Sequence, residues 1–87
     1  MAFVYILKSK KFQKYYIGST KRNPQQRLRD HNLGLVKSTK AIKPLELIVF
    51  KKFITYTQAR KVENKLKKLK RKDYIQKIVK DGYIKIS

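Results

Sequence analysis

Five polar side chains in this sequence have the chemical character needed to hydrolyse a phosphodiester bond: Tyr5, Tyr16, Arg27, His31 and Glu63. A phenol or an imidazole can take a proton from water, a guanidinium fits a phosphate, and a carboxylate binds a divalent metal. Each group also has an ordinary structural explanation. Tyrosines on strands usually pack in a core, and polar residues on a helix usually face solvent. The hypothesis therefore depends on whether the surrounding elements bring the five together.

Two short runs near the start of the chain, residues 2–7 and 15–19, are rich in β-branched and aromatic residues, which is typical of strands. The polar segment between them predicts a β-hairpin. A two-residue turn at residues 10–11 would place Tyr5 opposite Tyr16 on one face of the sheet. A register shifted by one residue would instead put the two rings on opposite faces.

The next pattern is a helix that begins at Asn23 and Pro24 and ends before Gly34. Asparagine is a favoured N-cap, proline is favoured in the first turn, and glycine commonly follows the last turn. Arg27 and His31 lie four residues apart in this segment, so they share one face of the helix. Spacing alone favours a solvated polar face over a functional one.

The second half of the chain alternates between strand and helix patterns. We expect a loop at residues 35–43 and a strand at residues 45–54. A long helix should then run from Thr55 or Thr57 to about residue 70. A short helix at residues 73–80 and an extended tail at residues 83–87 should complete the chain. Glu63 falls at the border of the apolar stripe of the long helix, where it would lose water unless it met a cation. An ion pair with Lys67 or Arg60 and a metal site are equally compatible with that position.

These elements predict a single domain over residues 1–87, of the α/β (α+β) class, with a three-stranded, largely antiparallel sheet flanked by helices. The chain has no cysteine, which excludes disulfides and thiolate metal sites. No apolar stretch approaches the ~20 residues of a spanning helix, and no secretory signal pattern is present. We therefore expect a cytoplasmic protein without a membrane partner.

Charge is the strongest compositional signal, with 24 Lys and Arg against five Asp and Glu and a formal net charge of +19. A lysine-rich genome would inflate the first number, but it does not explain the scarcity of carboxylates. Such a surplus attracts nucleic acid and makes binding depend steeply on salt. Candidate DNA-binding residues are Lys14, Lys21, Arg22, Lys40, Lys43 and Lys67.

Four stretches of the sequence together resemble the GIY-YIG nuclease domain. They are Val4-Tyr5-Ile6-Leu7, Tyr15-Tyr16-Ile17-Gly18-Ser19-Thr20, Arg27-Leu28-Arg29-Asp30-His31-Asn32, and the segment 59–67 around Glu63. They occur in the family's order over essentially the whole chain. The chain is similar in particular to small stand-alone bacterial members, which are related to the N-terminal domain of the excision-repair incision subunit.

The resemblance implies a role for each candidate. Tyr5 would be the general base that activates water, and His31 would relay a proton or form a hydrogen bond with Tyr5. Tyr16 would position water or phosphate, and Arg27 would hold a phosphate oxygen. Glu63 would bind one Mg²⁺ (or Mn²⁺), and Gly18 is the glycine of the motif. We expect the cations and the metal to lower the pKa of the catalytic phenol. Phe3 and Val4 replace the motif's Gly-Ile, and Asn64 does not fit the family's late asparagine.

The predicted function is that of a metal-dependent endonuclease, a hydrolase that cuts DNA in repair or recombination. The alternative is a non-catalytic nucleic-acid-binding module with the same fold, and RNA is a less favoured partner than DNA. A domain of 87 residues would nick one strand, so that a protein partner or a homodimer would be needed for any larger task.

Overall fold

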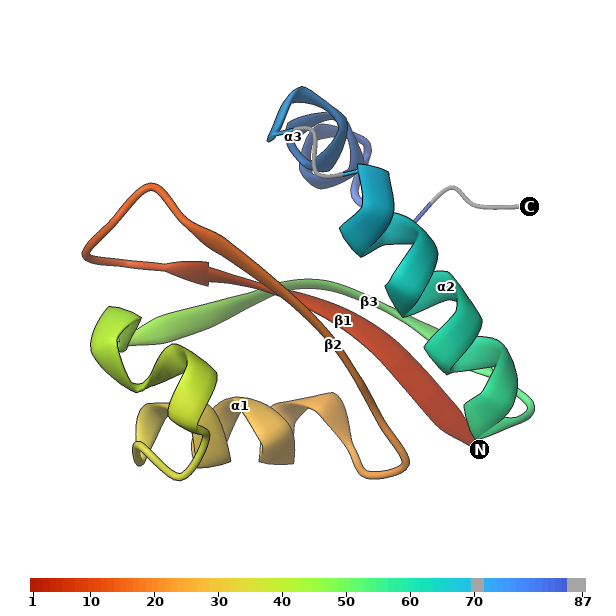
Figure 1. The fold of residues 1–87 in the computed structure, drawn as a ribbon, viewed down its shortest axis with the longest axis horizontal. Helices are drawn as coiled ribbons and strands as arrows, with labels where there is room; N and C mark the ends of the chain where they lie inside the picture. Colours follow the sequence, from red (N-terminus) through yellow and green to blue (C-terminus); the bar gives the residue numbers. More distant parts are fainter. Residues whose placement is uncertain (70–71, 85–87) are drawn as a thin grey trace.

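The computed structural model describes residues 1–69 and 72–84. In chain order its elements are β1 (Ala2–Ser9), β2 (Tyr15–Thr20), α1 (Pro24–Asn32), the 3₁₀ helix η1 (Lys37–Ile42), β3 (Leu45–Phe53), α2 (Tyr56–Leu69) and α3 (Lys72–Asp81). Figure 1 shows the three strands crossing the middle of the molecule, with α1 and η1 on one side and α2 and α3 on the other. The predicted α+β fold with a three-stranded antiparallel sheet is confirmed.

The sheet has the strand order β2-β1-β3, so β1 is central and β2 lies at an edge. Tyr5 of β1 is opposite Gly18, and Leu7 is opposite Tyr16. The register thus differs by two residues from that of a two-residue turn, which would place Tyr5 opposite Tyr16. Because a shift of two keeps side chains on the same face, the structure has the alternative in which the two rings share a face.

A longer hairpin connection causes this shift. The Ser9 amide donates to the Lys14 carbonyl oxygen at 3.0 Å, which leaves four residues in the connection in place of two. The Ser9 hydroxyl oxygen also accepts from the backbone amides of Lys11, at 3.2 Å, and Phe12, at 3.0 Å. A serine side chain that binds amides two and three residues ahead stabilises a turn without needing glycine.

The ends of α1 agree with the sequence. The Asn23 side chain accepts from the Gln25 amide at 2.8 Å, and proline follows as the first helical residue. At the other end the amides of Gly34 and Leu35 bind the carbonyls of His31 and Asp30, each at 3.1 Å. Gly34 has φ of +79°, and this arrangement is a Schellman cap, which requires that conformation.

Asn32 fastens the end of α1 to the start of β3. Its Oδ1 accepts from the Leu45 amide at 2.6 Å, and its Nδ2 donates to the Leu45 carbonyl at 3.0 Å. A side chain that satisfies both backbone groups of one residue fixes the helix relative to the strand. His31, one residue earlier on α1, is thereby held against the sheet.

The alternation of β1 divides the core into two clusters, one on each face of the sheet. The larger cluster lies under α2 and α3 and contains Ala2, Val4, Ile6, Ile17, Val49, Ala59, Leu66, Ile75, Ile78 and Ile84. The smaller cluster consists of Tyr5, Leu7 and Leu45, with Tyr16, Leu28, Ile42 and Leu47 packed around it. The candidate catalytic tyrosines thus belong to the smaller cluster, on the face that α1 and η1 cover (Figure 1).

Two segments differ from expectation or cannot be compared with it. Residues 35–43, predicted as a loop, contain η1, whose short i to i+3 turns leave no apolar periodicity to detect.

At the start of α2, Thr55 is the N-cap of the two candidates, since its hydroxyl accepts a hydrogen bond from the Gln58 amide at 3.2 Å. Of the expected tail strand, residues 83 and 84 form no strand, while residues 85–87 and the predicted helix end near residue 70 lie outside the described residues.

Candidate nuclease site

The phenol of Tyr5 lies across Gly18 toward the free edge of β2. A Cβ atom added to Gly18 would stand 2.5 Å from the Tyr5 hydroxyl oxygen and 2.6 Å from its Cζ. It would also stand 3.0 Å from Cε2 of Tyr16. No other residue type leaves this space, so the glycine determines where the phenol can lie.

Tyr5, Tyr16 and His31 form one aromatic cluster. The Tyr5 hydroxyl is 3.0 Å from His31 Nε2, and His31 Nδ1 is 2.6 Å from the hydroxyl oxygen of Thr39, a fully buried residue of η1. The Thr39 hydroxyl donates to the Val36 carbonyl at 3.4 Å. With the Thr39 hydroxyl donating to Val36, His31 Nδ1 donates a hydrogen bond to the Thr39 oxygen. His31 Nε2 then accepts a hydrogen bond from the Tyr5 hydroxyl. The Tyr16 ring centroid lies 5.0 Å from the imidazole.

Burial in this cluster shifts the pKa values of His31 and Tyr5 in opposite directions. Burial, reinforced by the nearby Arg27 cation, lowers the pKa of His31 to about 4, with Asp30 partly offsetting the shift. Burial raises the pKa of Tyr5, although the Arg27 guanidinium works against it. Our expectation of a lowered tyrosine pKa is therefore wrong in the free protein, because desolvation of a buried phenolate outweighs the local cation.

Arg27 is held in place by Asp30. The Asp30 carboxylate oxygen Oδ2 accepts from Arg22 Nη1 at 3.1 Å and from Arg27 Nη1 at 3.4 Å. Arg27 keeps 27% of its side chain exposed, while Arg22 keeps 51%. One carboxylate thus collects two guanidinium groups at the end of β2 and the start of α1, and leaves donors on each for an external anion.

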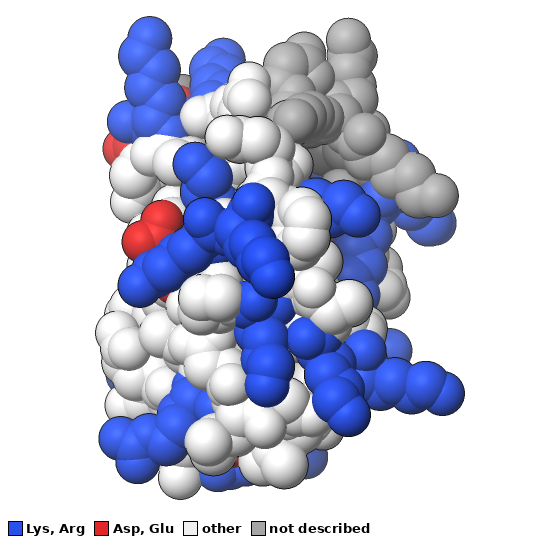
Figure 2. Space-filling view, turned by 90° about the vertical axis from the view of Figure 1, so that its left-hand side faces the viewer, with Lys and Arg blue, Asp and Glu red and all other residues white. Residues whose placement is uncertain are grey.

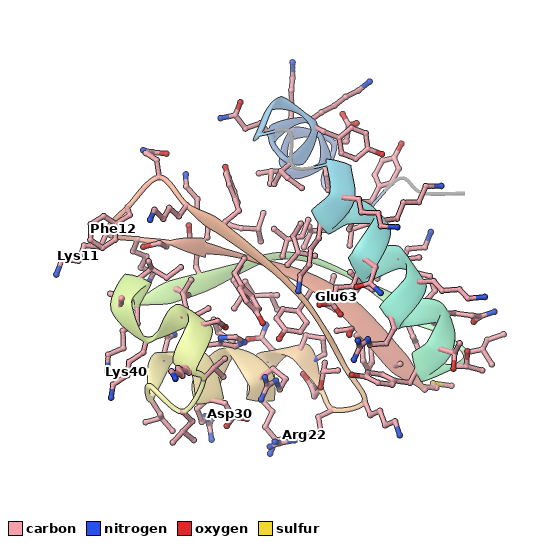
Figure 3. The ribbon with its side chains drawn as sticks, viewed as in Figure 1. Lys11, Phe12, Arg22, Asp30, Lys40 and Glu63 are labelled. Carbon is pink, nitrogen blue, oxygen red and sulfur yellow. The ribbon has the colours of Figure 1, made fainter. Side chains whose placement is uncertain are left out.

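Glu63 approaches the same strand edge from the other face of the sheet. Its side chain is only 12% exposed. Oε1 accepts a hydrogen bond from the Ser19 hydroxyl, and Oε2 is 2.6 Å from the ammonium of Lys67. Glu63 points from α2 toward the strands in Figure 3, well away from Asp30 and Arg22 on the α1 side. The ion pair with Lys67 that spacing allowed is confirmed.

The five candidate residues therefore surround the edge of β2, with Glu63 on one face and the other four on the other face. Lys67 connects the two faces, since its Nζ lies 5.7 Å from the ring centroid of Tyr16. A hollow of about 370 Å³ opens at the end of the strand and is lined by Ser19, Thr20, Lys21, Arg22, Arg27 and Tyr56. This hollow adjoins the partners of both Glu63 and Tyr5.

The candidate DNA-binding residues lie in three places. Lys21 and Arg22 line the hollow, and Lys14 and Lys67 line a neighbouring groove of about 530 Å³ along β2 that also includes Tyr16. Lys40, in η1, points outward on the far side from Glu63 (Figure 3), and Lys43 follows the same element. Figure 2 shows lysine and arginine scattered across the described part of one face, with little Asp or Glu, so the positive surface extends beyond the site.

Sequence reasoning missed four residues that position the candidates: Ser19, Asp30, Thr39 and Tyr56. Tyr56 has the spacing of the apolar stripe of α2, yet its hydroxyl lies close enough to Arg60 and Ser19 for hydrogen bonds that lower its pKa. Ser19 and Asp30 stand inside the quoted motifs and were detectable as polar neighbours. Thr39 carried no signal, because it lies in a segment without periodicity.

A three-stranded antiparallel sheet with helices packed against it is consistent with a known class of nuclease folds. Residues 1–78 match the sequence model of the GIY-YIG catalytic domain, and the chain belongs to that family. The chain is also similar to UPF0213 proteins of Listeria innocua, Listeria welshimeri and Listeria monocytogenes. Each is 39% identical over 83 residues, which cover 94% of this chain and 83% of the relative.

No solved structure matches the chain. Within residues 1–69 and 72–84, no helix is both long and apolar enough to cross a membrane.

Proposed function

We propose that this chain is a Mg²⁺- or Mn²⁺-dependent endonuclease that hydrolyses phosphodiester bonds of DNA in the cytoplasm. The observation that carries the proposal is the meeting of Tyr5, His31 and Arg27 with Glu63 around one strand edge, next to a hollow lined by cations. Membership of the GIY-YIG family supports hydrolysis of nucleic acid. A role in repair or recombination rests only on the resemblance to the excision-repair incision subunit.

The residues around Glu63 suit a hard divalent cation. Its neighbours Ser19 and Tyr56 offer only oxygen, and the described part of the chain has no cluster of three or more His, Asp or Glu. One carboxylate completed by water molecules is a common way to bind Mg²⁺. Bound there, the ion would neutralise charge that develops on the leaving 3′ oxygen.

Tyr5 is the residue we assign to activate water, with His31 as its hydrogen-bond partner. In the free protein burial raises the pKa of Tyr5 and lowers the pKa of His31 to about 4, so moving a proton from the phenol to the imidazole is unfavourable. A phosphate bound beside His31 would raise the pKa of the imidazole, and Arg27 already favours the phenolate. Substrate binding therefore changes the site in the direction that the proton transfer needs.

Arg27 and the hollow beside it provide the place for the phosphate. Lys21, Arg22 and Arg27 line the hollow, and Asp30 fixes the two guanidinium groups. A guanidinium offers paired donors in a plane, which match two oxygens of a phosphate. Tyr16, half-buried between the His31 ring and Lys67, is placed to position the phosphate or the attacking water.

The test is a cleavage assay on single-stranded, duplex and branched DNA with added Mg²⁺. The wild type is compared with Glu63→Gln, which keeps the size of the side chain, and with Glu46→Gln, a matched change at an exposed glutamate of β3. We expect Glu63→Gln to cut at least about 100-fold more slowly, since a catalytic metal supplies several kcal/mol, while DNA binding persists. Glu46→Gln should cut normally.

Two outcomes would contradict the proposal. Cutting by Glu63→Gln at the wild-type rate would remove Glu63 from the reaction. If no variant cuts any substrate, yet all bind DNA with steep salt dependence, the chain is a nucleic-acid-binding module that has this fold without the activity.

A further inference from the structure

Lys67 occupies the oxygen of Glu63 that a metal ion would use. The Ser19 hydroxyl holds Oε1, and the Lys67 ammonium lies 2.6 Å from Oε2, so both carboxylate oxygens already have partners. A neutral hydroxyl can remain bound to a carboxylate that also binds a cation. An ammonium is disfavoured beside a bound metal ion, because two positive charges would then repel each other across one oxygen.

A displaced Lys67 has an obvious second place. The Lys67 side chain is 47% exposed and has a flexible four-carbon stem, so its ammonium can leave Glu63 without any movement of the helix. Its Nζ already lies 5.7 Å from the Tyr16 ring centroid, and Lys67 and Tyr16 line the same groove. A phosphate that reached Tyr16 along this groove would be within reach of the ammonium.

We propose that Lys67 has two partners in turn: it pairs with Glu63 in the metal-free protein and with a phosphate of the substrate once metal is bound. This inference rests on the proposed function, because it takes Glu63 as the metal ligand. Its consequence is thermodynamic. Metal releases Lys67 for DNA, and DNA removes Lys67 from Glu63, so each ligand strengthens the binding of the other by the same factor.

Two other cations of α2, Arg60 and Lys68, do not offer this exchange. Arg60 lies over the Tyr56 ring, with its Cζ 5.9 Å from the ring centroid, and makes no ion pair with Glu63. Lys68 is exposed and has no carboxylate partner within the described residues. Lys68 therefore provides a matched control that removes one charge from the same helix turn without touching Glu63.

The experiment measures Mn²⁺ affinity by calorimetry for the wild type, Lys67→Met, Lys67→Arg and Lys68→Met. An ion pair on a partly exposed surface changes a binding constant by about two- to fivefold. We expect Lys67→Met to bind Mn²⁺ tighter than Lys68→Met by that factor. Lys67→Arg keeps the competing cation and should bind no tighter than the wild type. Circular dichroism of each variant checks that it is folded.

A second measurement tests the exchange itself. The affinity for labelled DNA is determined by fluorescence anisotropy with and without Mn²⁺, at constant ionic strength. We expect Mn²⁺ to tighten DNA binding in the wild type and in Lys68→Met, and to have a smaller effect in Lys67→Met.

The outcomes separate this inference from the proposed function. Equal Mn²⁺ affinity in Lys67→Met and Lys68→Met would overturn the exchange, even if the wild type cuts DNA through Glu63. If instead Glu63→Gln binds Mn²⁺ as well as the wild type does, Glu63 is not the ligand, and the proposed metal site fails together with the inference.

Discussion

Replacing Gly18 by alanine tests the geometry of the site most directly. The added Cβ would lie 2.5 Å from the Tyr5 hydroxyl oxygen, about 0.9 Å inside the 3.4 Å at which ordinary contact begins. Gly18 does not have a positive φ, so alanine is compatible with the backbone there. The cost therefore comes mainly from the clash with the Tyr5 phenol, with a smaller part from Cε2 of Tyr16 at 3.0 Å. Apart from these clashes, alanine in a strand is about 0.5–1 kcal/mol more favourable than glycine.

Overpacking of a core costs about 1–3 kcal/mol, so we expect a net loss of roughly 1–2 kcal/mol in the free energy of unfolding. In a domain of this size that loss lowers the melting temperature by about 4–8 °C per kcal/mol. The effect on catalysis should be larger. A reacting group moved by about 1 Å can cost on the order of 100-fold in rate, and the phenol must move by nearly that distance.

The assay combines urea unfolding, followed by circular dichroism, with DNA cleavage at saturating substrate. Tyr5→Leu provides the matched background, because it removes the hydroxyl and Cζ that the new methyl group would meet. Gly18→Ala should be neutral or stabilising in that background. Equal destabilisation in both backgrounds, or wild-type cleavage by Gly18→Ala alone, would refute the view that the glycine exists to admit the phenol.

Two further predictions concern the α1 side of the sheet. The pKa of His31 is about 4 in the folded protein against an ordinary value of 6.5, so the unfolded chain binds a proton first as pH falls. Stability is therefore fully present above pH 6.5 and should drop by about 2–3 kcal/mol by pH 4.5. Urea unfolding from pH 7 to 4.5 measures this drop, and His31→Gln should lack it; an equal drop in both proteins would exclude His31 as its cause. Asn32→Ala should cost about 1–3 kcal/mol, because both backbone groups of Leu45 lose a partner, whereas Asn64→Ala, at an exposed position of α2, should cost little in the same unfolding assay. Equal losses in the two asparagine variants would contradict the proposed link between α1 and β3.

Most helices and strands could be predicted from the sequence, because residues with known capping preferences stand at the helix ends. Asn23 and Pro24 begin α1, Gly34 ends it, and Thr55 caps α2. The hairpin register was beyond sequence reasoning. Its turn has no Asn-Gly or Asp-Gly signal, and it is closed by the Ser9 side chain, which pattern rules do not reveal.

The sequence named candidate residues that the structure brings to one strand edge, but it gave only part of their electrostatics. The motifs named the five candidate residues, whose roles are still predictions, and helical spacing allowed the pair of Glu63 with Lys67 that the structure contains. The direction of the Tyr5 pKa shift was not predictable, because a net charge of +19 says nothing about how deeply one phenol is buried. Thr39, which binds the far side of His31, meets it only through the packing of η1 against α1.

The two core clusters differ greatly in size, and this difference couples catalysis to local stability. Among the described residues, Tyr5 is one of three buried hydrophobic residues in the smaller cluster, while ten form the larger one under α2 and α3. We therefore expect the face with fewer buried apolar groups to open at a lower free energy than the rest of the molecule. The phenol that we assign to the reaction is thus also a main support of the less stable half. Partial loosening by heat or denaturant would end catalysis first, while the larger half of the domain is still folded.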